Sequence, residues 1–335
     1  EFTRQFQCHF IVTGSYLGRV LEPEFRFSSG DVTSVTIYTL SFEEYLAAAD
    51  IELFRMYLLI GNSVFEDKNY YEQLKQLYNI YCQIGGYPAV VEKYLSSGSL
   101  EIATKELRRI IETFLNESMR YFTDILDVSV FADIFLNICR ILAREKKGLE
   151  QDSIGEELQK LVVKDSTSNI SKATVVRAIN WLYHSGIIGF CGKIVELDIL
   201  DFKPGRRCYF MDLGIANFYM TQAGLDKASI NGTLNENYVY INLVKRLDFP
   251  QQIAFETPAF ATYKSGEIDF YVQSLKERTR YVIEVKSGKQ SGNTAKKALF
   301  DGKADYLLYL KGNTHGGVEG KIITRPIYTL ERFHF

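Results

Sequence analysis

Residues 281–286 read YVIEVK, an apolar run that contains two charged side chains, Glu284 and Lys286. Its β-branched and aromatic residues predict a buried strand. Side chains two positions apart in a strand point to the same face, so Glu284 and Lys286 should lie together while Ile283 and Val285 face the other way. A charge buried in a strand is costly unless it is paired or bound to a metal ion. This strand therefore needs partners.

A neighbouring strand offers such a partner. Residues 266–272 (GEIDFYV) predict the preceding strand of a hairpin, from which Asp269 reaches the same face. Carboxylates on adjacent strands are suitable ligands for Mg²⁺, so Asp269 and Glu284 are the predicted metal ligands. Lys286 beside them is placed to orient an attacking water and to stabilise developing phosphate charge, as in metal-assisted phosphodiester hydrolysis. The alternative is a salt-bridged strand without catalysis.

The rest of the C-terminal part predicts a small α/β unit. An amphipathic helix over residues 234–247 carries Glu236 in its first turn. Further apolar and amphipathic runs predict strands over 252–256, 304–310 and 322–327 and a helix over 294–300. The resulting order is helix, strands, helix, strand.

The N-terminal half is predicted to be mostly helical. Residues 9–13 and 35–40 read as short strands, and Ser41 followed by two glutamates predicts a capped helix start. Apolar residues at helical spacing then recur from about residue 70 to residue 144.

Residues 150–200 have the pattern of a winged helix. Helices are predicted over 154–161 and 171–183, followed by a hairpin formed by 187–190 and 195–197. The second helix offers Lys172 and Arg177 on its exposed side as candidate DNA contacts. Two basic residues are a small electrostatic footprint, and winged helices also serve as protein-docking or spacer modules.

Composition excludes several classes of protein. The net charge of -2 requires no polyanionic partner, so a nucleic-acid surface has to be a local patch. No apolar run is long enough for a membrane helix, and there is no signal peptide. The five cysteines are scattered and form no CxxC pair, which favours reduced thiols and a cytoplasmic location.

Several stretches together resemble one known family. They are FIVTGS at 10–15, YTLSFEEYL at 38–46, GGYPAVV at 85–91, YFMDLGIANFY at 209–219, GTLNENYV at 232–239, GEIDFYV at 266–272 and IEVKSGK at 283–289. The chain resembles the prokaryotic AAA-type ATPases that carry a conserved C-terminal domain of unknown function. That domain belongs to the restriction-endonuclease-like, or PD-(D/E)xK, superfamily.

The resemblance implies a multidomain α/β chain. Residues 1–65 would be the remnant of a AAA-type ATPase domain, 66–148 a helical region, 149–205 a winged-helix-like region and 206–335 a restriction-endonuclease-like domain. It also implies that Glu236, Asp269, Glu284 and Lys286 are the catalytic residues, with Mg²⁺ as the cofactor.

In the ATPase remnant, the resemblance places Thr13, Gly14 and Ser15 near the γ-phosphate of a nucleotide. The chain departs from the family, however, because it contains no G-x-x-x-x-G-K-[ST] motif and has Gly30-Asp31 where relatives have Gly-Arg. We therefore expect ATP to bind only in a full-length parent whose nucleotide-binding motifs lie upstream of residue 1.

Three functions are compatible with the sequence. The leading hypothesis is a fragment of a AAA-type ATPase with a nuclease-like C-terminal domain that acts on DNA or binds it. The alternatives are a stand-alone Mg²⁺-dependent nuclease and a non-enzymatic module that binds DNA or a protein partner. Full-length relatives often form rings, but the sequence predicts no oligomeric state for this chain.

Overall fold

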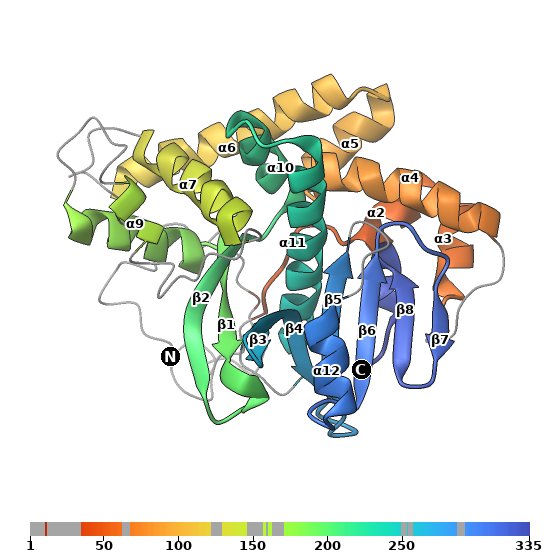
Figure 1. Cartoon of the computed structure of the whole chain (residues 1–335). Coiled ribbons are helices and arrows are strands. Elements are labelled where there is room, and N and C mark those ends of the chain that lie inside the picture. Colours follow the sequence, from red (N-terminus) through yellow and green to blue (C-terminus); the bar gives the residue numbers. More distant parts are fainter. Residues whose placement is uncertain are drawn as a thin grey trace, which may run out of the picture.

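The computed structural model describes residues 35–61, 68–121, 129–145, 171–248, 257–286 and 292–335, together with 11, 157–158, 160–162 and 253. These residues combine helices with an eight-stranded mixed sheet, which gives an α/β fold (Figure 1). The strand order across the sheet is β2-β1-β3-β4-β5-β6-β8-β7.

Among the elements whose bounds the structure describes, seven helices precede the first strand and three more lie between strands. They are α2 (Phe42–Ala49), α3 (Ile51–Leu58), α4 (Lys68–Ile84), α5 (Pro88–Ser97), α6 (Leu100–Tyr121), α7 (Ser129–Glu145), α9 (Lys172–His184), α10 (Leu213–Gln222), α11 (Lys227–Asp248) and α12 (Asn293–Phe300). The strands are β1 (Ile188–Ile194), β2 (Phe202–Phe210), β3 (Ala259–Tyr263), β4 (Gly266–Gln273), β5 (Arg280–Lys286), β6 (Tyr306–Lys311), β7 (Gly317–Glu319) and β8 (Ile322–Pro326). Short 3₁₀ turns lie at η2 (Val195–Leu197) and η3 (Ile327–Arg332).

Helices α11 and α12 cover opposite faces at the centre of the sheet. Val239 of α11 belongs to the larger hydrophobic core together with Ile283 of β5. Ala295 of α12 belongs to a second core with Val282, the residue next to Ile283. Because adjacent strand residues face opposite sides, the middle of β5 is buried on both faces, and Glu284 is held away from bulk water.

Strand pairing makes the sheet continuous from the hairpin to the C-terminal strands. β1 and β2 are antiparallel, and β1 pairs in parallel with β3. β3, β4 and β5 form an antiparallel meander, and β6 pairs in parallel with β5 after the α12 crossover. The predicted boundary between residues 205 and 206 falls inside β2.

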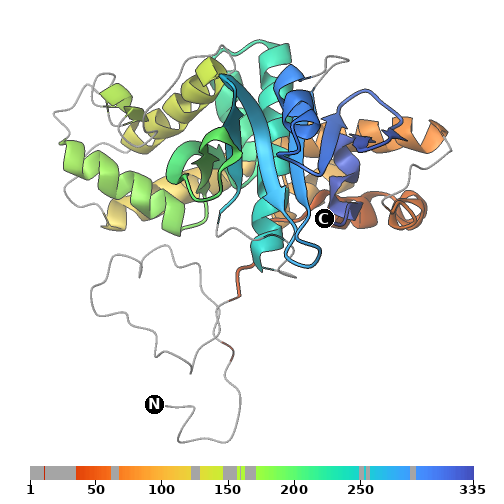
Figure 2. The same ribbon diagram turned by 60° about the horizontal axis from the view of Figure 1, so that its bottom comes forward.

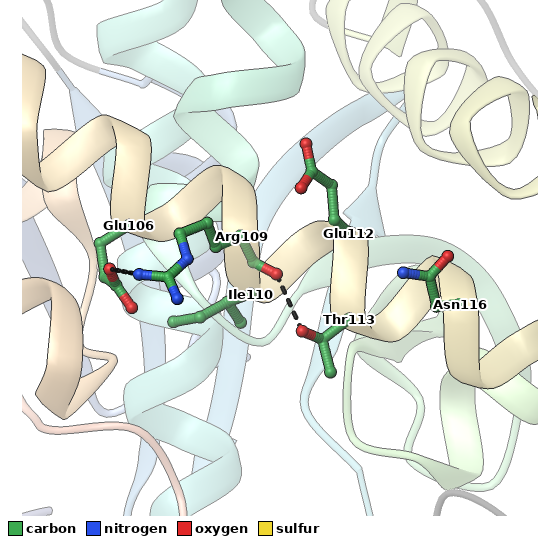
Figure 3. A pocket seen from close by; sticks show the side chains of 6 residues that line it. All are labelled: Glu106, Arg109, Ile110, Glu112, Thr113 and Asn116. Carbon is green, nitrogen blue, oxygen red and sulfur yellow. Dashed lines mark hydrogen bonds and ion pairs between the residues drawn. The ribbon is translucent and has the colours of Figure 1, made fainter.

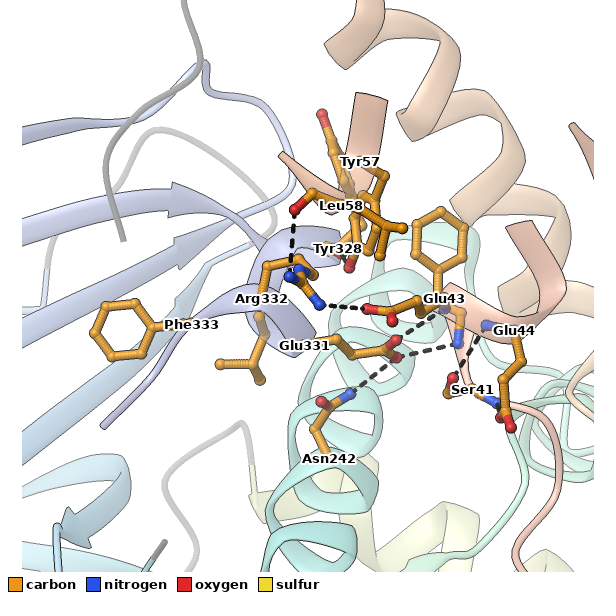
Figure 4. A network of polar contacts seen from close by, with 12 residues as sticks. Ser41, Glu43, Glu44, Tyr57, Leu58, Asn242, Tyr328, Glu331, Arg332 and Phe333 are labelled. Carbon is orange, nitrogen blue, oxygen red and sulfur yellow. Dashed lines mark hydrogen bonds and ion pairs between the residues drawn. The ribbon is translucent and has the colours of Figure 1, made fainter. Parts of the chain in front are cut away.

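The N-terminal helices pack against the C-terminal end of the chain, as both views show (Figures 1 and 2). Glu331 of η3 accepts hydrogen bonds from the backbone N–H groups of Phe42 and Glu43 at 3.0 and 2.8 Å, at the start of α2 (Figure 4). Its carboxylate also accepts from Tyr238 and Asn242 of α11 at 3.1 and 3.4 Å. One carboxylate therefore joins three elements that are far apart in sequence.

Several predicted elements are confirmed. Ser41 caps α2 in a complete capping box with Glu44, and Ser171 caps α9. The strands predicted at 266–272 and 281–286 are β4 and β5. The helix predicted at 234–247 begins earlier, at Lys227, so Glu236 lies in its interior and not in its first turn.

Other predictions were wrong. Residues 35–40 form no strand, because Val35 and Ile37 are exposed and the N–H of Leu40 pairs with the carbonyl of Gly86. Residues 195–197 form the turn η2, in which Glu196 and Leu197 have φ values of 52° and 56°, and the second strand of the hairpin begins only at Phe202.

Candidate functional site

The candidate site lies where β4 and β5 separate. Their antiparallel register runs from Gln273 opposite Arg280 to Phe270 opposite Ile283. Beyond that pair, the carboxylate of Asp269 accepts a hydrogen bond from the backbone N–H of Val285 at 2.7 Å. A side chain thus takes the place of a backbone acceptor, and this fixes the Asp269 carboxylate beside the end of β5.

Lys286 brings the two carboxylates together. Its Nζ lies 2.7 Å from Oε2 of Glu284 and 3.4 Å from Oδ2 of Asp269. The Glu284 side chain is only 3% exposed, while those of Asp269 and Lys286 are 19% and 26% exposed. Three of the residues predicted from sequence therefore surround one point, with Lys286 reaching it from the more open side.

The electrostatics show a local shortage of positive charge. Burial, reinforced by the charge of Asp269, raises the pKa of Glu284 to about 7. Burial and then the charge of Glu236 raise the pKa of Asp269, although Lys286 opposes this. Burial alone would lower the pKa of Lys286, but Asp269 and Glu284 together raise it. Both carboxylates would be stabilised as anions by a further cation.

Glu236 belongs to the same cluster but is held differently. Its Oε1 accepts a hydrogen bond from the Tyr209 hydroxyl at 2.6 Å and lies 3.6 Å from Nη1 of Arg207. Its effect on the pKa of Asp269 shows that the two carboxylates are close enough to interact. The fourth predicted residue therefore acts electrostatically on Asp269 and is anchored by residues of β2.

Arg207 is a site residue that the sequence reasoning missed. Its side chain is 4% exposed, it pairs with Glu236 and Glu267, and its guanidinium lies 3.8 Å from the ring centroid of Phe260. Arg207 could have been predicted in the same way as Glu284, because it is a charged residue next to the apolar end of a strand. That signal was weaker here because exposed residues precede Arg207 on β2.

The Glu284 carboxylate is also bounded by a glycine. A Cβ at Gly292, the N-cap of α12, would lie 2.4 Å from the Glu284 carboxyl group, so the space admits no side chain. The hydroxyl of Tyr309, which lies beside Glu284 on β6, donates to the carbonyl of Gly292 at 3.2 Å. The start of α12 is thereby held against the buried carboxylate.

The donor set suits a hard divalent cation. Asp269 and Glu284 direct oxygens toward the same ammonium group, and Mg²⁺ is commonly held by one or two carboxylates with water completing its shell. Within the described ranges, no three His, Cys, Asp or Glu side chains are grouped as ligands for one ion. A bound ion would therefore take most of its ligands from water or substrate.

Other predicted site residues lie elsewhere. Thr13, Gly14 and Ser15 are outside the described residues, as is the side chain of Lys172. Arg177 is exposed on α9.

A shallow hollow on α6 offers no comparable chemistry (Figure 3). The six residues that line it all belong to this helix: Glu106, Arg109, Ile110, Glu112, Thr113 and Asn116. Glu106 and Arg109 pair with each other at 3.0 Å, one helical turn apart.

Two glycine-containing stretches of the sequence, GGYP at 85–88 and MDLG at 211–214, have a structural role. The buried carboxylate of Asp212 caps α10 by accepting from the N–H groups of Gly214 and Ile215, and it also accepts from the N–H of Gly86 at 2.8 Å. A Cβ at Gly86 would lie 2.1 Å from the Leu40 carbonyl oxygen. The GGYP and MDLG stretches therefore meet at a tight junction that holds α4, α5 and α10 together.

Comparison with known protein families found a match in the middle of the chain. Residues 75–228 match the family described as a domain of unknown function (DUF8612). No curated protein and no solved structure matches the chain. The matched region contains Arg207 and Tyr209 but ends before Glu236, Asp269, Glu284 and Lys286, and its description names no activity.

In the described part of the chain, no helix has the length and apolar character needed to cross a membrane.

Proposed function

We propose that Asp269, Glu284 and Lys286 form a Mg²⁺-dependent site for phosphodiester hydrolysis in a restriction-endonuclease-like domain that acts on DNA. The observation that carries this proposal is the convergence of the buried Glu284 carboxylate, the partly buried Asp269 carboxylate and Lys286 where β4 and β5 separate. A site with this composition provides ligands for a cation and a positive charge directed at the same point.

The order of elements supports the proposal. Helix α11 is followed by the meander β3–β4–β5, the crossover helix α12 and the parallel strand β6. This is the helix, strands, helix, strand order that the sequence patterns predicted for the restriction-endonuclease-like region. The finer assignment of the fold rests on that order and on the quoted motifs.

Each residue of the site would have its own role in hydrolysis. Asp269 and Glu284 would hold Mg²⁺, which would supply a Lewis acid at this point. Lys286 carries a firmly held proton because both carboxylates raise its pKa. It therefore acts as a cationic donor that orients the water and stabilises negative charge on the phosphate oxygens. The N–H of Val285 keeps Asp269 in place.

A cleavage assay tests this function. Linear and branched DNA are incubated with the protein and Mg²⁺ or Mn²⁺, and Lys286→Ala should lower the rate by about 10²–10³-fold because a preorganised charge is removed from the transition state. Lys321→Ala is the matched control, since Glu319 and Lys321 have the same spacing on the exposed region around β7 and β8. Cleavage that survives Lys286→Ala would show that this site is not the catalyst.

A second candidate is a module that binds DNA or a protein without cleaving it. The ammonium of Lys286 already contacts both carboxylates, so part of their charge is compensated without a metal ion. DNA binding without cleavage in either metal would favour this candidate. The proposal that the parent protein is a AAA-type ATPase rests on the sequence resemblance alone.

A further inference from the structure

A second lysine, Lys311, lies beside Lys286 at the C-terminal ends of two neighbouring parallel strands. β5 and β6 pair with Lys286 opposite Lys311, and the N–H of Gly312 continues the ladder by donating to the carbonyl of Lys286 at 3.0 Å. Residues paired in this register point to the same face, and adjacent strands lie about 4.8 Å apart. The two lysine side chains therefore start from neighbouring points on the face of the sheet that carries Glu284.

The ammonium groups of these two lysines have different partners. Nζ of Lys286 is directed into the site, 2.7 Å from Glu284 and 3.4 Å from Asp269. Nζ of Lys311 instead lies over the ring of Tyr309, 5.0 Å from the ring centroid. In the part of the chain that the structure describes, no carboxylate forms an ion pair with Lys311, which is partly exposed. The charge of Lys286 is thus compensated by the site, whereas the charge of Lys311 is available to an anion from solution.

Tyr309 fixes the position of the Lys311 charge. The tyrosine is 3% exposed, and it lies beside Glu284 in the register of β5 and β6. Its hydroxyl donates to the carbonyl of Gly292 at 3.2 Å, which holds the ring in place. A cation above an aromatic face is attracted by the ring without being neutralised, because the ring carries no net charge. Lys311 therefore presents a positioned positive charge at the edge of the candidate site.

We infer that Lys311 binds a DNA backbone phosphate next to the one that is cleaved, and that this contact fixes the position of the strand in the site. The inference rests on the proposed function, because it assumes that a phosphodiester lies over Asp269 and Glu284. Every nucleotide adds a phosphate to the strand, and contacts of cationic side chains with these phosphates set the position of a protein on DNA. Lys311 is suited to this contact because it lies on the strand next to Lys286 and lacks the carboxylate partners of Lys286.

Binding of a short fluorescently labelled duplex to the full chain in EDTA tests the inference without interference from metal-dependent cleavage. Lys311→Gln should weaken binding about 3- to 10-fold at moderate salt and reduce the slope of log K against log salt by about one, since a phosphate contact is lost. Lys311→Arg keeps the charge and should bind as the wild type does. Lys303→Gln is the matched control, because Lys303 is exposed and precedes β6 at the opposite end of the strand.

Cleavage kinetics in Mg²⁺ give a second readout. Lys311→Gln should raise the KM for the duplex by a similar factor and leave kcat within about twofold of the wild type, because Lys311 would contact no reacting atom. Hydrolysis of bis(p-nitrophenyl) phosphate, which has a single phosphate, should be unchanged. A fall in kcat with an unchanged KM, or an equal loss with the small diester, would place Lys311 at the cleaved phosphate and overturn the inference.

Loss of this contact and failure of the proposed function give different results. Wild-type binding by Lys311→Gln, or an equal loss of binding in Lys303→Gln, would overturn the inference alone. If Lys311→Gln does not fold, lysine acylation of the wild type, mapped by mass spectrometry, carries the test. The duplex should protect Lys311 and leave Lys303 reactive, and an unprotected Lys311 would overturn the inference. A wild type that neither binds nor cleaves DNA would overturn the proposed function and the inference with it.

Discussion

At the scale of residues, the buried charge of β5 was the most informative feature of the sequence. The alternation rule placed Glu284 and Lys286 on one face, and the structure puts them 2.7 Å apart. Asp269 was expected to reach them because it lay on the adjacent strand, and it does so through Lys286 and Val285.

Sequence periodicity could not predict that Arg207 and Gly292 belong to this cluster. Arg207 arrives through a parallel pairing of β1 with β3, and Gly292 through the docking of α12. Both depend on contacts between distant segments, which local patterns do not encode.

The raised pKa of Glu284 predicts a pH-dependent stability in the absence of metal. The pKa is about 7 in the folded protein, against an ordinary value of 4.5. Between these values the folded state binds more protons than the unfolded state, so stability falls as pH rises, by up to about 3 kcal/mol. Glu284→Gln removes this dependence.

Urea unfolding in EDTA at pH 5 and pH 8 measures the effect. The unfolding free energy of the wild type, relative to that of Glu284→Gln, should fall by about 2–3 kcal/mol between the two pH values. Glu319→Gln, on the exposed strand β7, is the matched control. An equal difference at both pH values would contradict the assigned burial of the Glu284 charge.

At the scale of elements, local signals worked where the local sequence decides the structure. The capping box of α2, the cap of α9 and the strands β4 and β5 follow from side-chain chemistry within a few residues. The strand predicted at 35–40 does not form, because a β-branched run becomes a strand only when another strand pairs with it. The neighbour of this segment is the turn at Gly86, whose carbonyl accepts from the N–H of Leu40.

The junction around Asp212 predicts a large structural effect. Asp212→Ala leaves the N–H groups of Gly86, Gly214 and Ile215 without their acceptor in a buried setting, and it should lower the unfolding free energy by about 3 kcal/mol. Asp226→Ala is the matched control, because Asp226 also accepts from two backbone N–H groups at a helix start but is exposed. The control should lower the unfolding free energy by much less, because the N–H groups that Asp226 caps remain accessible to water. Equal losses in urea denaturation would contradict the role assigned to the junction.

At the scale of the whole molecule, three regions that were predicted separately are physically joined. The hairpin of the winged-helix-like region is part of the same sheet as β3–β8, and α2 is held by Glu331 from the C-terminal end of the chain. The sequence pattern indicated helices and strands but not this joining, because sheet continuity and the Glu331 contacts link residues far apart in the chain.

Metal-directed backbone cleavage tests the central claim, which is that Asp269 and Glu284 converge on one bound cation. Fe²⁺ is substituted for Mg²⁺, hydroxyl radicals are generated with ascorbate and peroxide, and the cut positions are mapped by mass spectrometry. We predict cuts clustered around residues 269 and 284 that disappear with excess Mg²⁺ and in the variant Asp269→Asn/Glu284→Gln. Cuts that persist in that variant, or the absence of cuts at both positions in the wild type, would contradict the claim.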